Sequence, residues 1–478
     1  MKERASSLLT INNLSLEINN KSILKNINLD VKKGEIVLIC GKSGSGKSTL
    51  ASVLSGYYKN MAATIDYDRL SILDNDLESF ETYNRYPYLA VSFQNARLSL
   101  CTQNLREELI FVLENLDTGR NLIEEAVISQ AKKHGIMNLL DQDFDTLSGG
   151  QLQRVAFCAI DLIDSKLYVL DEPFANIDDN STYDLQKIIR QRLDEGSSYL
   201  IIDHRLELWD FVDRIVVIDP DGRIVDDKIN PKNISQEQKK LLIDNGLIFD
   251  GKSYKEKSLN ASIDFLKAYN LNISYETDKE VKSIIKDSSF SMPANKLIAL
   301  TGESGAGKST LFKVLLRQLS YNGSIKIWDK ELNSYRKKDL LGRIGLVFQD
   351  PTLQFVRTNV LEEFTGHRNY DDVSQENIDL LKTYRLDTYV DKSPWMLSQG
   401  EQRRLAVLTM LALDKDLLLV DEPTYGQDFK NASLIMEDLK ALSKDTTIIF
   451  TSHDQNLIRA YKDVEYRIID KKVVRIDW

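Results

Sequence analysis

A glycine-rich stretch near the N-terminus constrains the fold of this chain more than any other feature. It reads Gly41-Lys42-Ser43-Gly44-Ser45-Gly46-Lys47-Ser48-Thr49, between apolar runs at residues 36–40 and 50–54. A buried strand, a glycine-rich turn and a helix start form a phosphate cradle, in which backbone N–H groups and the helix dipole point at one anion. We expect Lys47 to reach the terminal phosphates and the Ser48 hydroxyl to bind Mg²⁺, while the glycines leave room for phosphate oxygens.

A second copy of the pattern argues against an accidental loop. Residues 302–310 read Gly302-Glu303-Ser304-Gly305-Ala306-Gly307-Lys308-Ser309-Thr310, again directly after an apolar run. Other landmarks recur at similar spacing, since 261 residues separate Lys47 from Lys308 and 249 residues separate His204 from His453. The chain is therefore a tandem duplication.

Strands alternate with helical segments around each phosphate loop, which predicts an α/β fold with a mainly parallel core sheet in each half. Antiparallel strands are expected ahead of the loop, and a helical region after it. The 478 residues are too many for one hydrophobic core and fit two domains. We place the first domain at residues 1–228 and the second at 261–478. The polar residues 229–260 form a predicted linker, with a short amphipathic piece at 236–243.

Composition restricts the possible partners. The net charge is −10, from 62 basic and 72 acidic residues, which argues against nucleic acid as the main partner. Cys40, Cys101 and Cys158 are widely spaced, so we expect neither a disulfide framework nor a zinc site, as in a reducing cytosol. We find no secretory signal and no run long enough to span a membrane. Any membrane role is therefore expected to depend on a partner.

Acidic pairs follow one apolar strand in each half. Asp171-Glu172 and Asp421-Glu422 each come after four apolar residues and before a proline. The carboxyl ends of strands in open α/β sheets face the crevice where ligands bind. We expect Asp171 and Asp421 in the Mg²⁺ shell, and Glu172 and Glu422 to polarise the attacking water. A solvated acidic loop is the alternative for one site alone, but not for two sites that each accompany a phosphate loop.

Two of the four histidines, His204 and His453, stand just after predicted strands at matched positions. Their recurrence favours contact with a γ-phosphate. A lone histidine is more often an ordinary surface or core residue, which is our interpretation of His134 and His367.

The stretch Leu147-Ser148-Gly149-Gly150-Gln151 precedes a predicted helix. A serine at a helix start, with exposed glycine N–H groups, is a second anion cradle. One domain needs one cradle per nucleotide, so the second cradle suggests service to the nucleotide of another subunit. An ordinary helix cap with a Gly-Gly turn is the alternative.

These motifs, with a glutamine after a strand (Gln94 and Gln349), resemble in their order the nucleotide-binding domain of ATP-binding cassette (ABC) proteins. The resemblance covers both halves outside the linker. It implies ATP and Mg²⁺ as cofactors and ATP hydrolysis as the activity. It also implies head-to-tail pairing, with each ATP held between the phosphate loop of one half and the serine-glycine signature of the other.

The resemblance assigns roles residue by residue. The implied ATP-binding residues of the first site are Gly41, Ser43, Gly44, Gly46, Lys47, Ser48 and Thr49, with Ser398 and Gly400 from the second half. Those of the second site are Gly302, Ser304, Gly305, Gly307, Lys308, Ser309, Thr310 and Tyr275, with Ser148, Gly149 and Gly150. The implied metal-shell residues are Ser48, Gln94 and Asp171 in the first site, and Ser309, Gln349 and Asp421 in the second. The implied catalytic residues are Gln94, Glu172 and His204, and Gln349, Glu422 and His453. Asp178 and Asp428 match the loop that links the two sites.

The sequence departs from the family pattern in three places. Gln399 stands where the second signature has its first glycine, so we expect slower turnover at the first site. Ile18 stands where Tyr275 provides an adenine-stacking ring in the second half, so weaker stacking is expected there too. The order Asp203-His204-Arg205 differs from the common one, in which aspartate follows histidine.

Residues 348–354, 359–364, 173–178 and 423–428 resemble the ATPases of energy-coupling factor importers, the cytosolic motors for vitamins and metal ions, which are sometimes fused. The first half, with Gln94-Asn95-Ala96-Arg97, lacks the proline of that pattern. The implied partners are a transmembrane coupling protein, docking beside Gln94 and Gln349, and a small membrane substrate-binding protein. The implied location is the cytoplasmic face of the cell membrane, as a peripheral protein.

Three alternatives stay open. Tandem ABC ATPases that act on ribosomes carry a long charged helical linker, whereas residues 228–260 are short and not strongly basic. Fused ATPases of sugar importers commonly have an altered second phosphate loop, whereas Lys308, Ser309 and Thr310 are intact. A nucleotide-gated scaffold without sustained turnover is disfavoured because both Glu172 and Glu422 are present. No residue identifies the cargo or the direction of transport.

Overall fold

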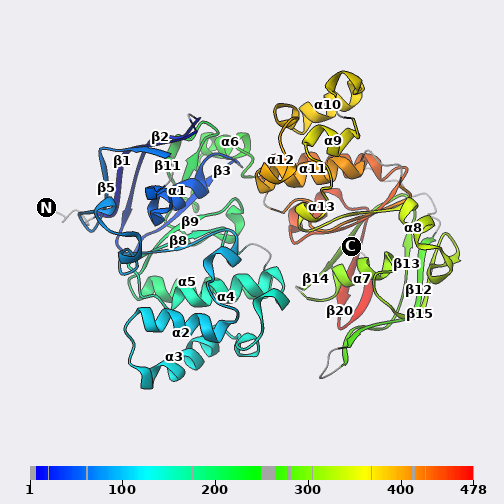
Figure 1. Ribbon diagram of the computed structural model, residues 1–478, viewed down its shortest axis with the longest axis horizontal. Helices are drawn as coiled ribbons and strands as arrows, with labels where there is room; N and C mark the ends of the chain where they lie inside the picture. The colour runs from blue at the N-terminus through cyan, green and yellow to red at the C-terminus, as the bar shows by residue number, and fades with distance from the viewer. Residues whose placement is uncertain are drawn as a thin grey trace. The chain divides into compact units, whose positions relative to one another are not determined.

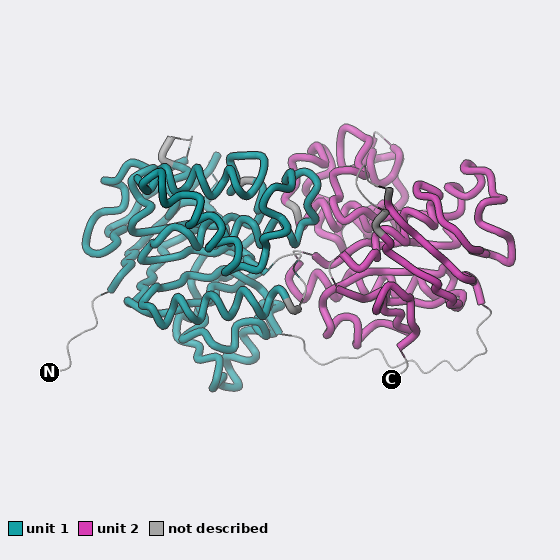
Figure 2. Tube along the Cα trace, turned by 90° about the horizontal axis from the view of Figure 1, so that it is seen from below, with its two compact units in different colours: residues 1–248 teal, residues 249–478 magenta. Residues whose placement is uncertain are grey.

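The computed structural model divides the chain into two compact units, residues 1–248 and 249–478 (Figure 2). Each unit contains a six-stranded sheet, a smaller antiparallel sheet and a set of helices (Figure 1). The structure describes residues 7–19, 21–42, 44–60, 63–174, 177, 179–248, 264–276, 281–303, 305–367, 369–411, 415–425 and 427–476.

The core sheet of the first unit has the strand order β11-β10-β3-β9-β8-β7. Neighbouring strands from β10 to β7 are parallel, and β11 is antiparallel to β10. The strands are β3 (Ile36–Gly41), β7 (Leu89–Ser92), β8 (Leu167–Asp171), β9 (Ser198–Ile202), β10 (Arg214–Ile218) and β11 (Ile224–Ile229). The expected mainly parallel α/β core is confirmed.

Both faces of this sheet are buried because alternate side chains of its strands enter different cores. In β3, Val37 and Ile39 pack with the small sheet and the first helix, whereas Ile36, Leu38 and Cys40 pack on the opposite face. The continuous apolar runs seen in the sequence follow from this burial on two sides.

The remaining elements of the first unit cover the core sheet. The small sheet consists of β1 (Ser7–Ile18), β2 (Lys21–Lys32), β4 (Ala63–Asp66), β5 (Arg69–Ile72) and β6 (Asn75–Asp76). The helices are α1 (Lys47–Ser55), α2 (Leu105–Asn115), α3 (Arg120–Lys133), α4 (Gly149–Asp161), α5 (Asp179–Asp194) and α6 (Gln236–Asp244). The helices α2 and α3 pack together with α4 around a separate apolar cluster, which is the predicted helical region.

The second unit repeats this order. Its core sheet runs β17-β18-β19-β14-β20-β21, and its small sheet runs β13-β12-β15-β16. The core strands are β14 (Leu297–Gly302), β17 (Ile344–Val347), β18 (Leu417–Val420), β19 (Thr447–Thr451), β20 (Val464–Ile469) and β21 (Lys472–Ile476). The small sheet has β12 (Asp264–Glu276), β13 (Val281–Pro293), β15 (Asn322–Ile327) and β16 (Lys330–Glu331). The helices are α7 (Lys308–Leu315), α8 (Lys337–Arg343), α9 (Val360–Thr365), α10 (Gln375–Thr383), α11 (Gln399–Leu411), α12 (Phe429–Leu442) and α13 (Gln455–Tyr461).

The first unit extends further than the predicted linker boundary. Ile229 ends β11 and is fully buried, and Leu242 of α6 is buried in the same core as the central strands. Leu247 joins that core after the helix. Residues 229–248 therefore belong to the first unit, because the apolar side of the amphipathic piece packs against its sheet. The rest of the predicted linker, residues 249–260, lies outside the described residues. Among the described helices, none is both long and apolar enough to cross a lipid bilayer.

Candidate active sites

Each phosphate loop begins at the end of a central strand and leads into a helix. Gly46 precedes α1 with φ of 91°, and Gly307 precedes α7 with φ of 108°. Within each loop, Gly44 and Gly305 also have positive φ, and a methyl group added to either would meet no atom within 4 Å. These two positions leave open space beside the backbone, which fits an approaching phosphate oxygen.

Other loop glycines are required by packing within the protein. A Cβ atom at Gly41 would collide with the carbonyl oxygen of Ile218, and one at Gly46 would lie 2.7 Å from the Leu24 side chain. We expected all the glycines to make room for phosphate, and the structure assigns these two a different reason. Ser43 and Ser304 lie outside the described residues.

The loop lysines are buried and bridge their own loops. The Nζ atom of Lys47 donates to the carbonyl oxygens of Gly41 at 2.8 Å and Lys42 at 2.9 Å. Lys308 makes the same contacts in the second unit, with Gly302 at 2.8 Å and Glu303 at 3.1 Å. Each ammonium group is thus fixed beside the helix N-terminus, where an anion is favoured.

In the first unit, Asp171 ends β8 beside the first residues of α1. Its carboxylate is almost fully buried and hydrogen-bonded to Ser48. Its Oδ1 atom has no hydrogen-bond partner among the described residues. Burial, together with the neighbouring Glu172 charge, raises the pKa of Asp171 to about 7. A buried carboxylate oxygen left without a donor, next to a serine hydroxyl, is a donor set that Mg²⁺ prefers.

Glu172 lies between the predicted glutamine and histidine. The Gln94 amide donates to Glu172 Oε2 at 2.8 Å, and His204 Nδ1 lies 3.3 Å from Oε1. Burial acts to raise the pKa of Glu172, but the contact with His204 outweighs it, so the pKa of Glu172 is lowered and that of His204 raised. Gln94 and Glu172 are 78 residues apart along the chain. Together with His204 they form one cluster at the end of the sheet.

The second unit arranges the same residue types differently. The Ser309 hydroxyl donates to Asp421 Oδ2 at 2.7 Å, and the Thr451 hydroxyl donates to Asp421 Oδ1 at 2.6 Å. The same Thr451 oxygen accepts a bond of 2.9 Å from the backbone N–H of Glu422. Both oxygens of Asp421 are therefore engaged, in contrast to those of Asp171.

Glu422 is the residue of the second acidic pair whose pKa is raised. Its side chain is buried, His453 Nε2 lies 3.4 Å from Oε1, and Oε1 has no hydrogen-bond partner among the described residues. Burial and the charge of Asp421 raise the pKa of Glu422 to about 7. Both Glu172 and Glu422 have left-handed backbones, with φ of 47° and 51°. That conformation turns each side chain out of the strand that precedes it.

Strand register supports the predicted match between Ile18 and Tyr275. Ile18 pairs with Lys21 and Tyr275 pairs with Lys282, and these lysines lie 261 residues apart, like the loop lysines. The Tyr275 hydroxyl lies 3.4 Å from the hydroxyl of Thr310 in α7. The second unit thus has a ring beside its phosphate loop on the strand where the first unit has an aliphatic side chain.

The two signature serines cap helices. Ser148 Oγ accepts from the Gln151 N–H at 3.3 Å, and Gln151 Oε1 accepts from the Ser148 N–H at 2.9 Å, at the start of α4. Ser398 and Glu401 make the same reciprocal pair at the start of α11. Among the described residues, neither serine hydrogen-bonds to the phosphate loop of its own unit. The matched caps hold the following glycine N–H groups at a helix start.

The linking-loop aspartates are described in one half only. Asp428 caps α12 by accepting from the Asn431 N–H at 3.0 Å. Asp178 lies outside the described residues. Gln349 follows β17, the strand that matches β7 before Gln94.

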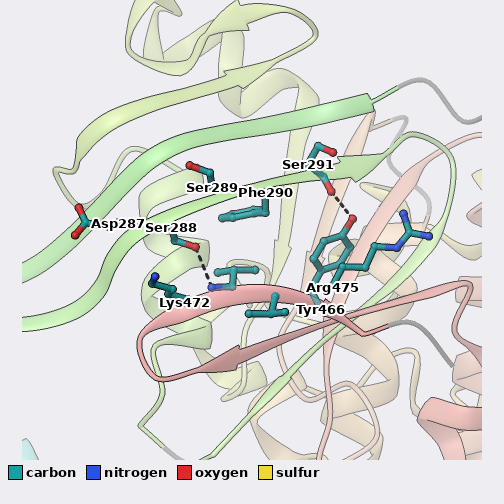
Figure 3. A pocket seen from close by; sticks show the side chains of 10 residues that line it. Asp287, Ser288, Ser289, Phe290, Ser291, Tyr466, Lys472 and Arg475 are labelled. Atoms are coloured by element: carbon teal, nitrogen blue, oxygen red, sulfur yellow. Dashed lines mark hydrogen bonds between the residues drawn. The ribbon is translucent and has the colours of Figure 1, made fainter.

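A hollow of about 470 Å³ lies away from the phosphate loop, between β13 and β21 of the second unit (Figure 3). Its walls are tied by structural hydrogen bonds, because the Val473 N–H donates to Ser288 Oγ at 2.9 Å and the Tyr466 hydroxyl donates to the Ser291 carbonyl. We interpret the hollow as the seam where the edges of the two sheets diverge.

The sequence analysis did not single out Thr451, whose hydroxyl hydrogen-bonds to both acidic residues of its site. The signal was available, because Ile202 occupies the matched position 249 residues earlier and the two halves differ there. It also missed the role of Asp203, whose buried carboxylate accepts from the backbone N–H of His204 at 2.7 Å and from Trp209 Nε1 at 3.0 Å. The unusual Asp203-His204 order therefore places a carboxylate that orients the histidine's backbone.

His134, which we interpreted as an ordinary histidine, belongs to a buried ion cluster. Its Nε2 atom lies 2.9 Å from Asp161 Oδ2, and Lys133 and Arg192 also contact the Asp161 carboxylate, at 2.7 and 2.9 Å. The cluster connects α3, α4 and α5 and is distant in sequence from the phosphate loop. We assign it a structural role.

Comparison with known proteins identifies the family. Residues 24–175 and 285–425 match the family model for ABC transporter. The chain belongs to the ABC transporter family. As an ABC protein with two matched domains it is an ATPase.

Curated relatives match this ABC protein along most of its length. "Putative HMP/thiamine import ATP-binding protein YkoD" of Bacillus subtilis is 32% identical over 95% of this chain and 89% of its own. "Putative ABC transporter ATP-binding protein" of Streptococcus pneumoniae serotype 4 is 30% identical over 96% of this chain and 88% of its own.

A solved structure shows the same fold. In the crystal structure of the archaeal ribosomal stalk protein aP1 with the archaeal ribosome recycling factor aABCE1, one chain aligns with a TM-score of 0.66. It is 21% identical and covers 96% of this chain and 87% of that chain. At this level of identity the likeness concerns the fold alone.

Proposed function

We propose that this ABC ATPase is the motor subunit of a membrane importer of the energy-coupling factor type. It drives uptake of a vitamin, a vitamin precursor or a metal ion through a transmembrane coupling protein. The name of the Bacillus subtilis relative, an HMP/thiamine import ATP-binding protein, supports this class of cargo. The glutamine-loop sequences of this chain, at residues 348–354 and 359–364, also support the proposed importer class.

One surface feature carries the proposal of a membrane-protein partner. Four large apolar side chains of the second unit are exposed, and we call them the apolar patch: Leu353 at 69%, Val356 at 77%, Trp395 at 49% and Met396 at 78% exposure. The Trp395 ring makes an edge contact with the buried Phe355 ring, with centroids 6.1 Å apart, which joins the two segments. Exposed apolar clusters of this kind mark interaction surfaces.

The apolar patch lies next to the nucleotide machinery in sequence. Leu353 and Val356 follow Gln349 by four and seven residues, and Met396 precedes Ser398 by two. A partner segment seated on the patch therefore contacts the glutamine loop and the signature helix together. ATP binding and hydrolysis at these elements can change the fit of that segment, which couples turnover to a membrane protein.

The first unit presents a different surface at the matched positions. Asp145 and Thr146 stand 250 residues before Trp395 and Met396, and the Arg97 guanidinium lies over the Phe144 ring at 5.7 Å. We propose that the coupling protein docks one apolar segment on the second unit and a more polar one on the first.

Within each site, we assign a separate role to each residue. Lys47 and Lys308 bind the terminal phosphates, and Glu172 and Glu422 orient and deprotonate the attacking water. Mg²⁺, when bound beside Asp171 or Asp421, neutralises charge on the phosphates. The residues present fit this ion, as the unpartnered Asp171 oxygen indicates.

The glutamines, the histidines and the signature residues have further proposed roles. Gln94 and Gln349 contribute to the metal shell, and His204 and His453 contact the γ-phosphate. Ser148, Gly149 and Gly150 serve the ATP of the second site, and Ser398 and Gly400 that of the first. With Gln399 in the second signature, the first site turns over more slowly.

The partners and the location follow from the proposed importer. They are a transmembrane coupling protein and a small membrane substrate-binding protein, with the ATPase held at the cytoplasmic face of the membrane through them. The net charge of −10 does not favour a nucleic-acid partner.

The test is affinity capture of the tagged chain from detergent-solubilised membranes of its own host, followed by mass spectrometry. We expect a multi-span coupling protein and a small hydrophobic companion, whose identity points to the cargo. Met396→Lys should lower their recovery at least about fivefold, because it places a charge in an apolar contact. The matched variant Thr146→Lys in the first unit should lower the recovery less, because the segment that we propose docks there is more polar.

Other outcomes separate the alternatives. Capture of ribosomal proteins, or of no membrane protein, overturns the importer while leaving the ATP sites in place. Capture of a permease that works with a soluble sugar-binding protein replaces the energy-coupling class with the sugar-importer class.

A further inference from the structure

We propose that Gln354 and Arg403 are positioning residues for Gln349 in the second unit. They fasten the two ends of its glutamine loop, residues 348–354, to the signature helix α11. This role rests on the proposed part of Gln349 in turnover at the second site, and it does not depend on the membrane partner.

Gln354 holds the C-terminal end of the glutamine loop against α11. Its Nε2 atom donates to the carbonyl oxygen of Ala406 at 2.7 Å and to the hydroxyl oxygen of Thr409 at 2.8 Å. The neighbouring Phe355 is buried in the apolar core to which Ala406 also belongs. One side chain therefore joins the loop to a helix residue 52 positions away, at the edge of that core.

A short capped turn connects Gln349 to this anchor. The Asp350 carboxylate accepts from the N–H of Thr352 at 2.9 Å and from its hydroxyl at 2.7 Å, which caps the 3-10 turn Pro351–Leu353. The N–H of Gln354 then donates to the carbonyl of the first turn residue at 3.1 Å. Because all the residues between Gln349 and Gln354 belong to this bonded turn or its cap, a displacement of the anchor is passed on to Gln349.

Arg403 holds the N-terminal end of the same loop. Its guanidinium donates to the carbonyl oxygen of Phe348, directly before Gln349, at 3.4 Å. The side chain is 1% exposed, and its Cζ atom lies 5.7 Å from the centroid of the Tyr425 ring. Among the described residues, the bond to Phe348 is the only hydrogen bond of this side chain, and its Nε atom has no partner. A cation buried at this cost directs its one bonded donor at the loop backbone.

The first unit has different residues at all three positions that make these tethers. By the spacing of the two glutamines and of the two signatures, the matched residues are Ser99 for Gln354, Ala159 for Thr409 and Gln153 for Arg403. Ser99 Oγ accepts from the N–H of Phe93 at 3.4 Å, which is a bond within its own loop. That loop packs on α4 through apolar contacts, with Leu100 and Ala156 in one cluster. A donor and its acceptor hydroxyl thus occur together in the second unit, as expected for residues that act as a pair.

The tethers should affect the chemical step more than nucleotide affinity. In the proposed scheme Gln349 acts on Mg²⁺ and the attacking water, whereas the phosphate loop binds the phosphates. A small misplacement of a positioned group can lower a rate about a hundredfold without weakening the binding of the substrate. Loss of a tether should therefore lower kcat and leave the KM for ATP nearly unchanged.

The experiment uses the full chain carrying Glu172→Gln, so that turnover reports the second site. Gln354→Met removes the donor, while the Ala406 carbonyl keeps its bond from the Thr409 hydroxyl at 2.9 Å. We expect kcat to fall about tenfold, with the KM for ATP within about twofold of the parent. Arg403→Gln, which introduces the residue of the first unit, should change kcat in the same direction. Arg403→Lys keeps a cationic donor and should recover about half of the parent kcat.

Hydrogen exchange of the nucleotide-free chain, followed by mass spectrometry, measures the tether without turnover. Amides of residues 348–356 should exchange at least about threefold faster in Gln354→Met than in the parent. The matched control is Gln402→Met. Gln402 is another glutamine of α11, and its Nε2 atom donates at 3.2 Å to the carbonyl of Pro394, outside the glutamine loop. This control should leave kcat and the exchange of residues 348–356 within about twofold of the parent.

A comparison with Gln349→Ala separates the possible failures. If Gln349→Ala lowers kcat but Gln354→Met and Arg403→Gln do not, the positioning role alone is overturned. If Gln349→Ala leaves kcat unchanged, the role of Gln349 at the second site is overturned, and the positioning role with it, while partner capture still decides the importer.

Two further results would also overturn the positioning role. An equal loss of kcat in Gln402→Met would show a general disturbance of α11. A rise in the KM for ATP as large as the fall in kcat would show that the variants disturb nucleotide binding instead of the glutamine loop.

Discussion

The hydroxyl of Thr451 donates a hydrogen bond of 2.6 Å to Asp421, and Ile202 occupies the matched position in the first unit. The Asp171-Glu172 and Asp421-Glu422 pairs are identical in sequence, but only the second has a threonine side chain as a hydrogen-bond partner at this position. In the first unit Asp171 keeps an unpartnered oxygen, and in the second the unpartnered oxygen belongs to Glu422. The duplicated sites differ in which carboxyl group has an oxygen without a hydrogen-bond donor among the described residues.

Exchanging these two residues tests that difference. Thr451→Ile removes a donor to Asp421 and an acceptor for the Glu422 N–H, so the second unit should lose about 1–3 kcal/mol of unfolding free energy. The reciprocal Ile202→Thr removes buried apolar atoms but provides a hydroxyl beside Asp171, so its cost should be partly offset and smaller than that of Thr451→Ile. Chemical denaturation of the full chain measures both. Equal losses in the two variants would contradict the assigned role of Thr451.

Replacing the acidic residue that we propose orients water should stop turnover and spare binding. Glu422→Gln should abolish most ATP hydrolysis at the second site while ATP binding persists, because the amide cannot accept the proton of the attacking water. Steady-state phosphate release and equilibrium ATP binding are the two measurements. Glu172→Gln is the comparison, with a smaller effect on total turnover if the first site is the slower one. Equal rates for Glu422→Gln and its parent would remove the site assignment.

The loop glycines should fall into two classes. Gly305→Ala meets no neighbouring atom but has φ of 77°, so it should cost about 1 kcal/mol of stability while greatly weakening ATP binding. Gly307→Ala combines φ of 108° with a collision against Ile284, so it should destabilise the second unit more than Gly305→Ala does. Thermal unfolding and ATP titration separate the two. The same order is expected for Gly44→Ala and Gly46→Ala in the first unit.

The ion cluster around Asp161 predicts a pH-dependent stability. Burial acts to raise the pKa of Asp161, but hydrogen bonds from His134 and Lys133 outweigh it and hold the pKa well below its usual value. A lowered carboxyl pKa stabilises the fold above the unfolded value of about 4, and this stabilisation is lost as the pH falls below it. Asp161→Asn should therefore cost about 3 kcal/mol at pH 7 and less near pH 3. A cost that stays constant over this range, measured by denaturant titration, would contradict the charge interaction.

The fold and the ATPase family could be predicted from the sequence, because both are indicated by local patterns. The phosphate loops, the strand-end acidic pairs and the period of apolar residues each occupy short windows. The amphipathic piece at 236–243 was predicted and matches α6, but it was assigned to the linker because its apolar side is short and its composition is polar; only its packing shows that it belongs to the first unit. Contacts such as Thr451 with Asp421 join strands that are distant in sequence, and spacing alone does not predict them.

The left-handed backbone at Glu172 and Glu422 limits how these sites can evolve. Asparagine, aspartate and glycine enter this conformation most easily, whereas valine, isoleucine and threonine are strongly disfavoured there. When the residue at this position changes under relaxed selection, the variants that remain well folded will therefore be drawn mainly from small or amide side chains. A duplicated ATPase that loses one site by this route should keep a folded, nucleotide-binding domain, and so can specialise one half as a regulator without rebuilding it.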